Sequence, residues 1–168
     1  MRIEYFISRE HEWQVLQKVM QSVDYNYDDL DATNTLVINV SPDYSSTVAM
    51  HLAHHLSNEG EMCDIITLDV PYPDQDMLPY FLKAKSDLHR LPRTYENYLF
   101  VEAAIIRGSN YSWISNLYKD RVPGKIITVA LFENKESKFK SDIVGEYYDD
   151  ATQDLTFYYE RYNKHWNG

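Results

Sequence analysis

The chain has little cysteine, little glycine and fewer basic than acidic residues. The shortages of cysteine and of positive charge exclude some kinds of site and partner. Its 168 residues include one cysteine, Cys63, which excludes an intramolecular disulfide, and no CxxC pair that could hold zinc. Sixteen Lys and Arg residues face 26 Asp and Glu residues, so the formal net charge is −10. Phosphate backbones and anionic lipids repel so acidic a chain, so we expect neither a nucleic-acid nor a membrane partner.

Long hydrophobic runs are also missing. No apolar run approaches the ~20 residues that cross a membrane, and residues 1–7 contain no secretory signal core. Together with the single cysteine, this predicts a cytoplasmic protein. Hydrophobic residues still make up 44% of the chain, enough for a packed core. We therefore predict one domain spanning residues 1–168.

Helix-like and strand-like segments alternate along the chain. Apolar residues three and four apart predict helices, over 9–23, 48–56, 77–88 and 112–119. Runs rich in apolar and β-branched residues predict strands, at 35–40, 64–68, 98–101, 125–132, 143–147 and 155–159. Such alternation indicates an α/β fold with a mostly parallel central sheet flanked by helices.

Two segments depart from this alternation. Residues 69–96 hold four of the six prolines and only a short helical pattern, so we predict a long loop or hood over a site. Residues 143–168 form an aromatic C-terminal extension, densest between Phe157 and Trp166. Exposed aromatic surface of this kind marks interfaces, so we expect the extension to pack against the domain or a second copy, favouring a homodimer.

The carboxyl ends of parallel strands are where α/β proteins bind ligands, and residues 102–110 follow such an end. Arg107-Gly108-Ser109-Asn110 is a turn that feeds a predicted helix. Glycine lets the backbone approach an anion, the helix start offers unpaired N–H groups, and Arg107 adds a donor suited to phosphate. The same four residues could equally form an ordinary turn with a Ser or Asn cap.

Residues 98–110 as a whole resemble the phosphoribosyl-pyrophosphate motif of the type I phosphoribosyltransferases. That motif is a hydrophobic strand, two acidic residues and a Thr-Gly-x-Thr turn into a helix. Glu102 matches the first acid and Gly108 the glycine, whereas Ala103 replaces the second acid. The resemblance implies the type I phosphoribosyltransferase fold, with Glu102 holding the ribose hydroxyls and residues 107–110 the 5′-phosphate.

Two further segments extend the resemblance. Residues 41–47 lie where the family has its pyrophosphate loop but lack its Arg-Gly-Gly, which leaves Ser45, Ser46 and Thr47 as candidates. The alternative is that Ser45 or Ser46 caps the helix that follows. The stretch from residue 128 to 160 is similar to the C-terminal part of purine-type members, where a lysine and an aromatic ring bind the base. The implied base-binding candidates are Lys135, Lys138, Ile143 and Phe157.

The resemblance leaves two functions open. One is an enzyme that transfers a ribose phosphate to a nucleobase or other acceptor, with Mg²⁺ on the leaving pyrophosphate. The other is a catalytically degenerate protein of the same fold that regulates by binding a nucleotide or a protein. Ala103, the pyrophosphate loop without basic residues, and Ile106 in place of an acidic base all weaken catalysis, because isoleucine cannot move a proton. The retained order of elements leans toward a diverged transferase.

Three histidines give a separate metal hypothesis. His51, His54 and His55 have the spacing of three and four that can bind a metal on a helix. Neither a carboxylate nor a cysteine joins them within a turn in a known zinc pattern, so we predict no metal ligands in the protein itself.

Overall fold

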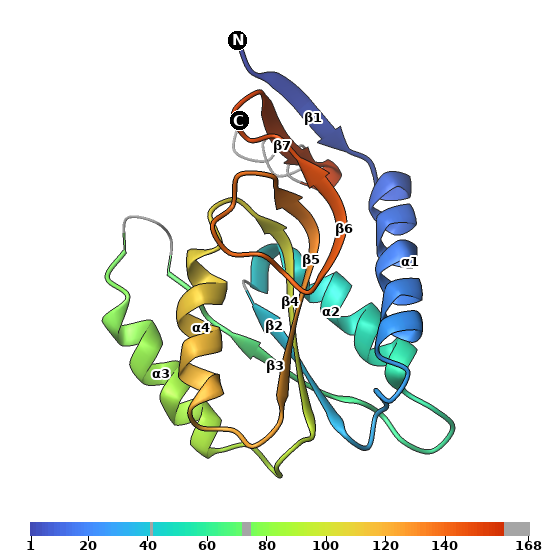
Figure 1. Cartoon of the computed structure of the whole chain (residues 1–168), viewed down its shortest axis with the longest axis vertical. Coiled ribbons are helices and arrows are strands. Elements are labelled where there is room, and N and C mark those ends of the chain that lie inside the picture. The colour runs from blue at the N-terminus through green and yellow to red at the C-terminus, as the bar shows by residue number, and fades with distance from the viewer. Residues whose placement is uncertain (41, 72–74, 160–168) are drawn as a thin grey trace.

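The structure is a computed structural model that describes residues 1–40, 42–71 and 75–159, with residues 42–46 described by their backbone alone (Figure 1). Its centre is a five-stranded sheet whose neighbouring strands are all parallel, in the order β3-β2-β4-β5-β6. The strands are β2 (Thr35–Val40), β3 (Asp64–Leu68), β4 (Asn97–Ile105), β5 (Lys125–Asn134) and β6 (Ile143–Tyr148).

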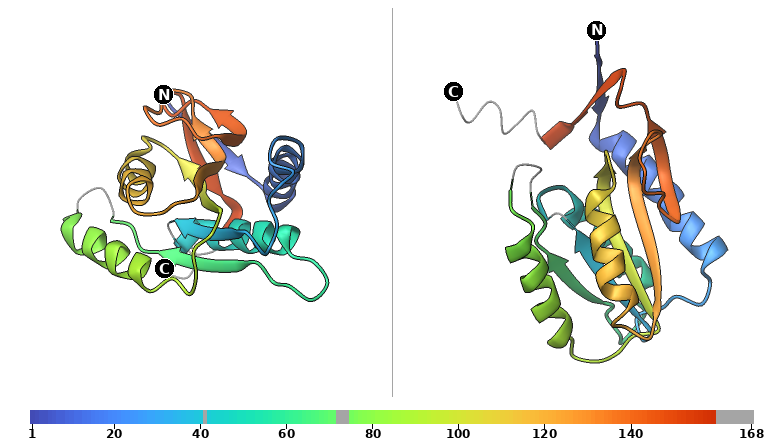
Figure 2. Two further views of the ribbon diagram at one scale, coloured as in Figure 1. Left: turned by 60° about the horizontal axis from the view of Figure 1, so that its bottom comes forward. Right: turned by 60° about the vertical axis from the view of Figure 1, so that its left-hand side comes forward.

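Helices cover both faces of this sheet (Figures 1 and 2). On one face pack α1 (Arg9–Asn26) and α2 (Pro42–Leu56), and on the other α3 (Leu78–His89) and α4 (Ser109–Lys119). The predicted α/β fold with a mostly parallel sheet between helices is confirmed. Parallel strands require such crossover helices, because after each strand the chain must return to the end of the sheet where the next strand begins.

The two faces bury different side chains. The α1–α2 face is mainly aliphatic, whereas the α3–α4 face carries aromatic rings, among them Tyr98, Phe100, Tyr111 and Tyr118. Phe100 and Tyr118 pack edge to face with ring centroids 5.0 Å apart. Every residue of β2 is buried, as expected for a central strand covered on both sides.

Two elements have different bounds from those the sequence indicates. Strand β4 continues four residues past Val101 to Ile105, still paired with β5, so Glu102 lies within the strand instead of at its end. Helix α2 begins at Pro42, six residues before the predicted start. Proline is well suited to the first helical turn, where its missing N–H costs nothing. Ser45 and Ser46 are therefore helical, and their predicted role as caps is wrong.

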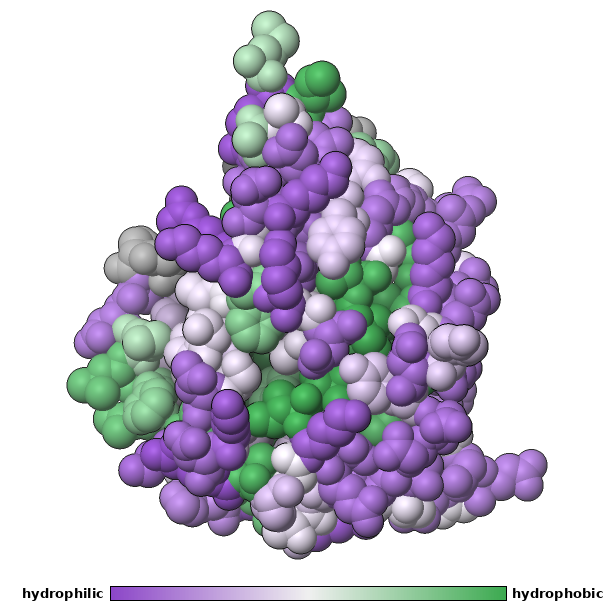
Figure 3. Space-filling view, in the orientation of Figure 1, coloured by the Kyte–Doolittle hydropathy of each residue, from purple (hydrophilic) through white to green (hydrophobic). Residues whose placement is uncertain are grey.

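Residues 69–96 are more ordered than the predicted loop. Helix α3 occupies twelve of them and packs beside α4, with the Phe81 and Trp113 rings 6.4 Å apart. Its outer side exposes Met77, Leu78 and Leu82, a green patch at the left of Figure 3. Most of the segment thus covers one face of the sheet, and residues 72–74 lie outside the described ranges.

A second, two-stranded sheet joins the two ends of the described chain. Strand β1 (Ile3–Ile7) pairs in parallel with β7 (Gln153–Phe157), and Arg2 forms ion pairs with Asp150 and Asp154. The sequence analysis did not predict β1, because its pairing partner lies about 150 residues away. In the described part of the chain, no helix is long and apolar enough to cross a membrane.

Candidate functional site

The site forms where the order of the strands reverses. Strands β2 and β4 are neighbours, but the chain goes from β2 outward to β3 on one side and from β4 to β5 on the other. At such a point the connections after the two strands diverge and leave a crevice, where doubly wound α/β proteins bind ligands. The connection after β4 is the short turn Ile106–Gly108, which leads into α4.

Gly108 sets the shape of this turn. Its φ of +76° lies in the left-handed region that residues with a Cβ rarely adopt. A Cβ at this position would also overlap the Cβ of Phe139 and come within 3.0 Å of Ser137 Oγ. The position therefore requires glycine for two independent reasons.

The start of α4 is free to accept an anion. Gly108 caps the helix without a side-chain oxygen, and the first turn contains no acidic residue. The N–H groups of this turn point out of the helix start together with the positive end of its dipole. Arg107 is exposed beside them. A phosphate could be held here by backbone N–H groups and one guanidinium.

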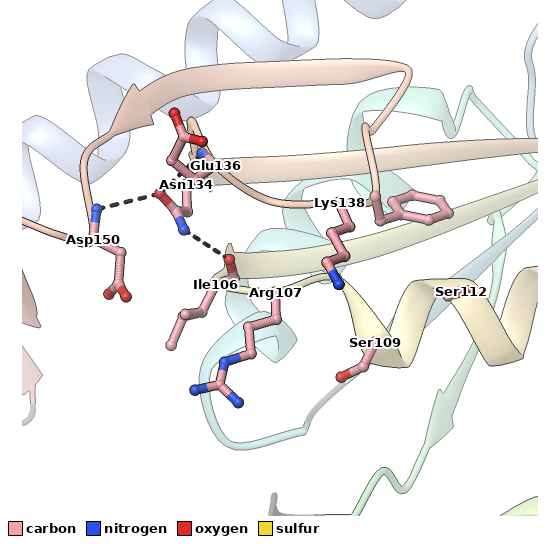
Figure 4. A pocket seen from close by; sticks show the side chains of 10 residues that line it. Ile106, Arg107, Ser109, Ser112, Asn134, Glu136, Lys138 and Asp150 are labelled. Carbon is pink, nitrogen blue, oxygen red and sulfur yellow. Dashed lines mark hydrogen bonds between the residues drawn. The ribbon is translucent and has the colours of Figure 1, made fainter.

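Two cavities adjoin the turn and share residues 106–109. The first, about 630 Å³, extends toward the end of β5 and is also lined by Asn134, Lys138, Phe139 and Asp150, among others. Figure 4 shows Lys138 directed toward the start of α4. The second, about 490 Å³, extends along the end of β4, where Glu102, Pro71 and Asn110 contribute. The turn thus sits between two spaces large enough for the two ends of one small ligand.

Glu102 is a half-buried carboxyl group in the second cavity. Burial raises the pKa of Glu102 to about 8, because the charged form loses its hydration. The side chain is therefore largely protonated at neutral pH. It also contributes, after desolvation, to the raised pKa of the buried Tyr111 hydroxyl. A protonated carboxyl can both donate and accept a hydrogen bond, so it can pair with a sugar hydroxyl in either direction.

Asn134 holds the first cavity together, and the sequence analysis did not identify it. Its amide nitrogen donates to the Ile106 carbonyl at 3.0 Å, while its Oδ1 accepts from the N–H groups of Glu136 and Asp150, both at 3.2 Å (Figure 4). One buried side chain at the end of β5 thus connects three segments that are far apart in the sequence. The signal in the sequence is a polar residue close behind the apolar run that ends at Phe132.

The base-binding candidates divide into two groups. Lys138 lines the first cavity, whereas Lys135 is exposed and is not among its lining residues. Ile143 and Phe157 are both buried in the core on the α1–α2 face, at 3% and 4% exposure. Phe157 packs against Phe132, with ring centroids 5.6 Å apart. Because core neighbours enclose Ile143 and Phe157, we retain only the lysines as base-binding candidates.

The remaining candidates are residues of α2. Ser45, Ser46 and Thr47 belong to α2, and Thr47 lines a third cavity between α1 and α2. His51 packs edge-on against Trp13, and His55 Nε2 lies 2.7 Å from an Asp24 carboxylate oxygen. Within the described ranges, no three His, Cys, Asp or Glu side chains gather as metal ligands.

Comparison with known proteins places this architecture in a class. No family model matches the chain, and no curated protein sequence matches it. Solved structures do: the xanthine-guanine-hypoxanthine phosphoribosyltransferase of Helicobacter pylori, 12% identical, has a TM-score of 0.69 over 99% of both chains. The purine phosphoribosyltransferase of Pyrococcus horikoshii, 10% identical, gives 0.66 over 92% of this chain and 91% of its own.

A third similar structure was determined with a nucleotide. The hypoxanthine-guanine enzyme of Leishmania tarentolae, in complex with GMP, is 16% identical with a TM-score of 0.61 over 85% of this chain and 79% of its own. The sheet order and the crevice therefore define a doubly wound α/β protein. Within that class, this chain has the type I phosphoribosyltransferase fold, as residues 98–110 predicted.

Proposed function

We propose that the protein binds a ribose phosphate or nucleotide at the turn after β4. The 5′-phosphate would lie on the first-turn N–H groups of α4 beside Arg107, and the ribose hydroxyls near Glu102. The observation that carries this proposal is the left-handed Gly108 at the start of α4, at the strand-order reversal. A positive φ alone is common in turns, as at Gly60, so the proposal depends on the place of Gly108 at the start of α4 and at the strand-order reversal.

The two cavities leave room for a nucleotide, whose base and 5′-phosphate are its two ends and whose ribose lies between them. Lys138 in the first cavity offers a donor for the carbonyl oxygen of a base, and the exposed Ile106 offers an apolar wall. The GMP in the Leishmania structure is a ligand of this kind, held by a protein of the same fold.

Magnesium would fit as an ion that arrives with its ligand. Mg²⁺ in phosphate sites is held by one or two carboxylates, waters and the substrate's own oxygens. Among the described residues that line the second cavity, Glu102 is the one carboxyl group, so a bound pyrophosphate would have to supply most of the ligands. A nearby cation would also favour the charged form of Glu102 and lower its raised pKa.

Transfer of the ribose phosphate is the further step that the fold would permit. The reaction needs stabilisation of the charge on the leaving pyrophosphate. A Mg²⁺ ion that arrives with the ligand would supply it, because the N–H groups of α4 and Arg107 would already hold the 5′-phosphate. The alternative is a regulator of the same fold that binds without turnover. Ala103, buried in the core where the family has its second acid, favours that alternative.

A ligand panel separates these possibilities. Thermal unfolding is followed with phosphoribosyl pyrophosphate, GMP, IMP and ribose 5-phosphate, each with and without Mg²⁺. A ligand at one hundred times its Kd should stabilise the fold by about 2.7 kcal/mol. Binding combined with pyrophosphate release in the presence of hypoxanthine, guanine or xanthine indicates the transferase, and binding without release indicates the regulator. Absence of any shift would refute the proposal.

Homodimer formation stays part of the proposal. In the described part of the extension, Phe157 and Tyr159 stack at 5.2 Å with Phe157 packed on the domain, while Tyr162 and Trp166 lie outside the described residues. Sedimentation velocity gives the oligomeric state directly. Leu82→Glu on the exposed side of α3 tests whether that apolar patch takes part, since a buried charge would shift the dimer toward monomer.

A further inference from the structure

A third cavity, of about 440 Å³, lies between α1 and α2, on the face of the sheet opposite α4. The buried side chains of Glu12 and Leu16 form its floor, and the rings of Trp13 and Tyr158 contribute to its walls. It shares no lining residue with the two cavities around the Gly108 turn. The inference drawn from it goes beyond the proposed function and does not depend on it.

Glu12 is the unusual residue of this cavity. Its side chain is only 7% exposed, and its Oε2 has no hydrogen-bond partner in the described part of the chain. Burial raises the pKa of Glu12, because the carboxylate has lost water without gaining a donor. A buried polar atom without a partner is costly, and few occur in native proteins. A carboxyl group left in this state at the floor of a cavity indicates a ligand that brings the missing donor.

Arg9 gives the mouth of the cavity the opposite charge. Both Arg9 and His51 line the mouth and are exposed. Arg9 lies three residues before Glu12 on α1, and no ion pair between them occurs among the described residues, although side chains at this spacing are neighbours. Both charges act on the Tyr158 hydroxyl: Glu12 raises its pKa and Arg9 lowers it, after the larger effect of burial. The Tyr158 ring therefore lies within the electrostatic reach of a negative floor and a positive rim.

We propose that this cavity binds a small zwitterion, with an ammonium group on Glu12, an apolar stem along Trp13 and Leu16, and a carboxylate facing Arg9. The ammonium supplies donors to the unpartnered oxygen, and the exposed Trp13 ring adds cation–π attraction. Cβ atoms three residues apart on a helix are about 5–6 Å apart, so a stem of a few methylenes can span the two charges. Free ω-amino acids and the exposed ends of peptides both offer this chemistry.

The test uses the full chain and three probes that differ only in charge: 5-aminopentanoate, pentylamine and pentanoate. Isothermal titration should show saturable binding of 5-aminopentanoate and weaker binding of either singly charged analogue. Glu12→Gln should weaken 5-aminopentanoate binding at least tenfold, because it removes one charge-assisted hydrogen bond. Glu10→Gln, an exposed carboxylate on the same helix that does not line the cavity, is the matched control and should bind normally.

Further controls distinguish a loss of ligand binding from a loss of the fold. Glu12→Gln replaces an unpartnered carboxyl by a neutral amide and should retain the fold, which the unfolding temperature checks. Arg9→Gln should weaken 5-aminopentanoate but leave pentylamine unchanged. Equal binding of pentylamine and 5-aminopentanoate would overturn the zwitterion, and unchanged binding in Glu12→Gln would overturn the site. A tripeptide ending in lysine, tested beside 5-aminopentanoate, distinguishes a peptide from a free amino acid as the source.

Discussion

Two connections meet at the reversal of strand order, and they are built differently. After β4, the chain makes a turn through the left-handed Gly108, with Arg107 exposed, before α4 begins at Ser109. After β2, Val40 and Pro42 leave a single residue between strand and helix, and α2 begins at a proline. Both helices start at the same end of the sheet, beyond the carboxyl ends of β2 and β4. The comparison teaches that two helices at one end of a sheet can begin differently: among the described residues of the two connections, only that after β4 places a left-handed glycine before its helix.

Replacing the glycine of that turn should have the largest effect. Gly108→Ala combines left-handed strain with overlap onto Phe139, so we expect a loss of about 2–5 kcal/mol of unfolding free energy. Urea denaturation measures it. Gly60→Ala is the matched control, because Gly60 also has a positive φ, of +94°, but no heavy atom within 4 Å of the added Cβ. It should lose only the strain, and equal losses at both positions would disprove the packing argument.

Removing the side chain that supports the β4 connection should have the next largest effect. Asn134→Ala deletes one donor and an acceptor shared by two N–H groups, and we expect a loss of about 1–3 kcal/mol together with weaker nucleotide binding. Asn134→Asp keeps the acceptor and removes the donor to Ile106. If the hydrogen bond from Asn134 to the Ile106 carbonyl matters for ligand binding, Asn134→Asp should recover more of the lost stability than of the lost nucleotide affinity. Parallel recovery of both would show a purely structural role.

The carboxyl group beside the turn should make stability depend on pH. Between pH 4.5 and pH 8, folded Glu102 retains a proton that the unfolded chain releases, so stability falls as pH rises through this window and is level above it. Glu102→Gln removes this dependence. The variant should therefore gain stability over the wild type at pH 8.5 and little at pH 5. Denaturation curves at pH 8.5 and pH 5 measure the difference in stability between the variant and the wild type. An equal difference at the two pH values would contradict the raised pKa of Glu102.

The direct comparison of the two connections should give the smallest change in stability and a clear change in binding. Arg107→Gln should weaken a phosphate ligand about tenfold without destabilising the fold, because Arg107 is exposed. Thr47→Ala, at an exposed position in α2, should leave the affinity unchanged. Titration of the ligand found in the panel measures both. A larger loss at Thr47 than at Arg107 would place the phosphate on the β2 side.

The sequence predicted the parts of this molecule that depend on local pattern. β-branched runs at 35–40 and 64–68 became strands with those bounds, since β-branched side chains pack well on a pleated sheet. The Gly108 turn was also visible, because a glycine between a strand and a helix has few other uses. The start of α2 was missed, since Ser45 and Ser46 look like caps until Pro42 is seen to begin the helix.

The sequence alone therefore determined the class of fold, the order of its elements and the place of the turn after β4. Each element is indicated by a pattern within about ten consecutive residues, and the class of fold follows from the order of those elements along the chain. Only the tertiary structure decided that β1 pairs with β7, that Asn134 ties three segments together, and that Glu12 lies buried without a partner. Those features depend on which distant residues meet. Burial and hydrogen bonding between residues 16 to 150 positions apart are properties of the packed chain, and no local pattern records them.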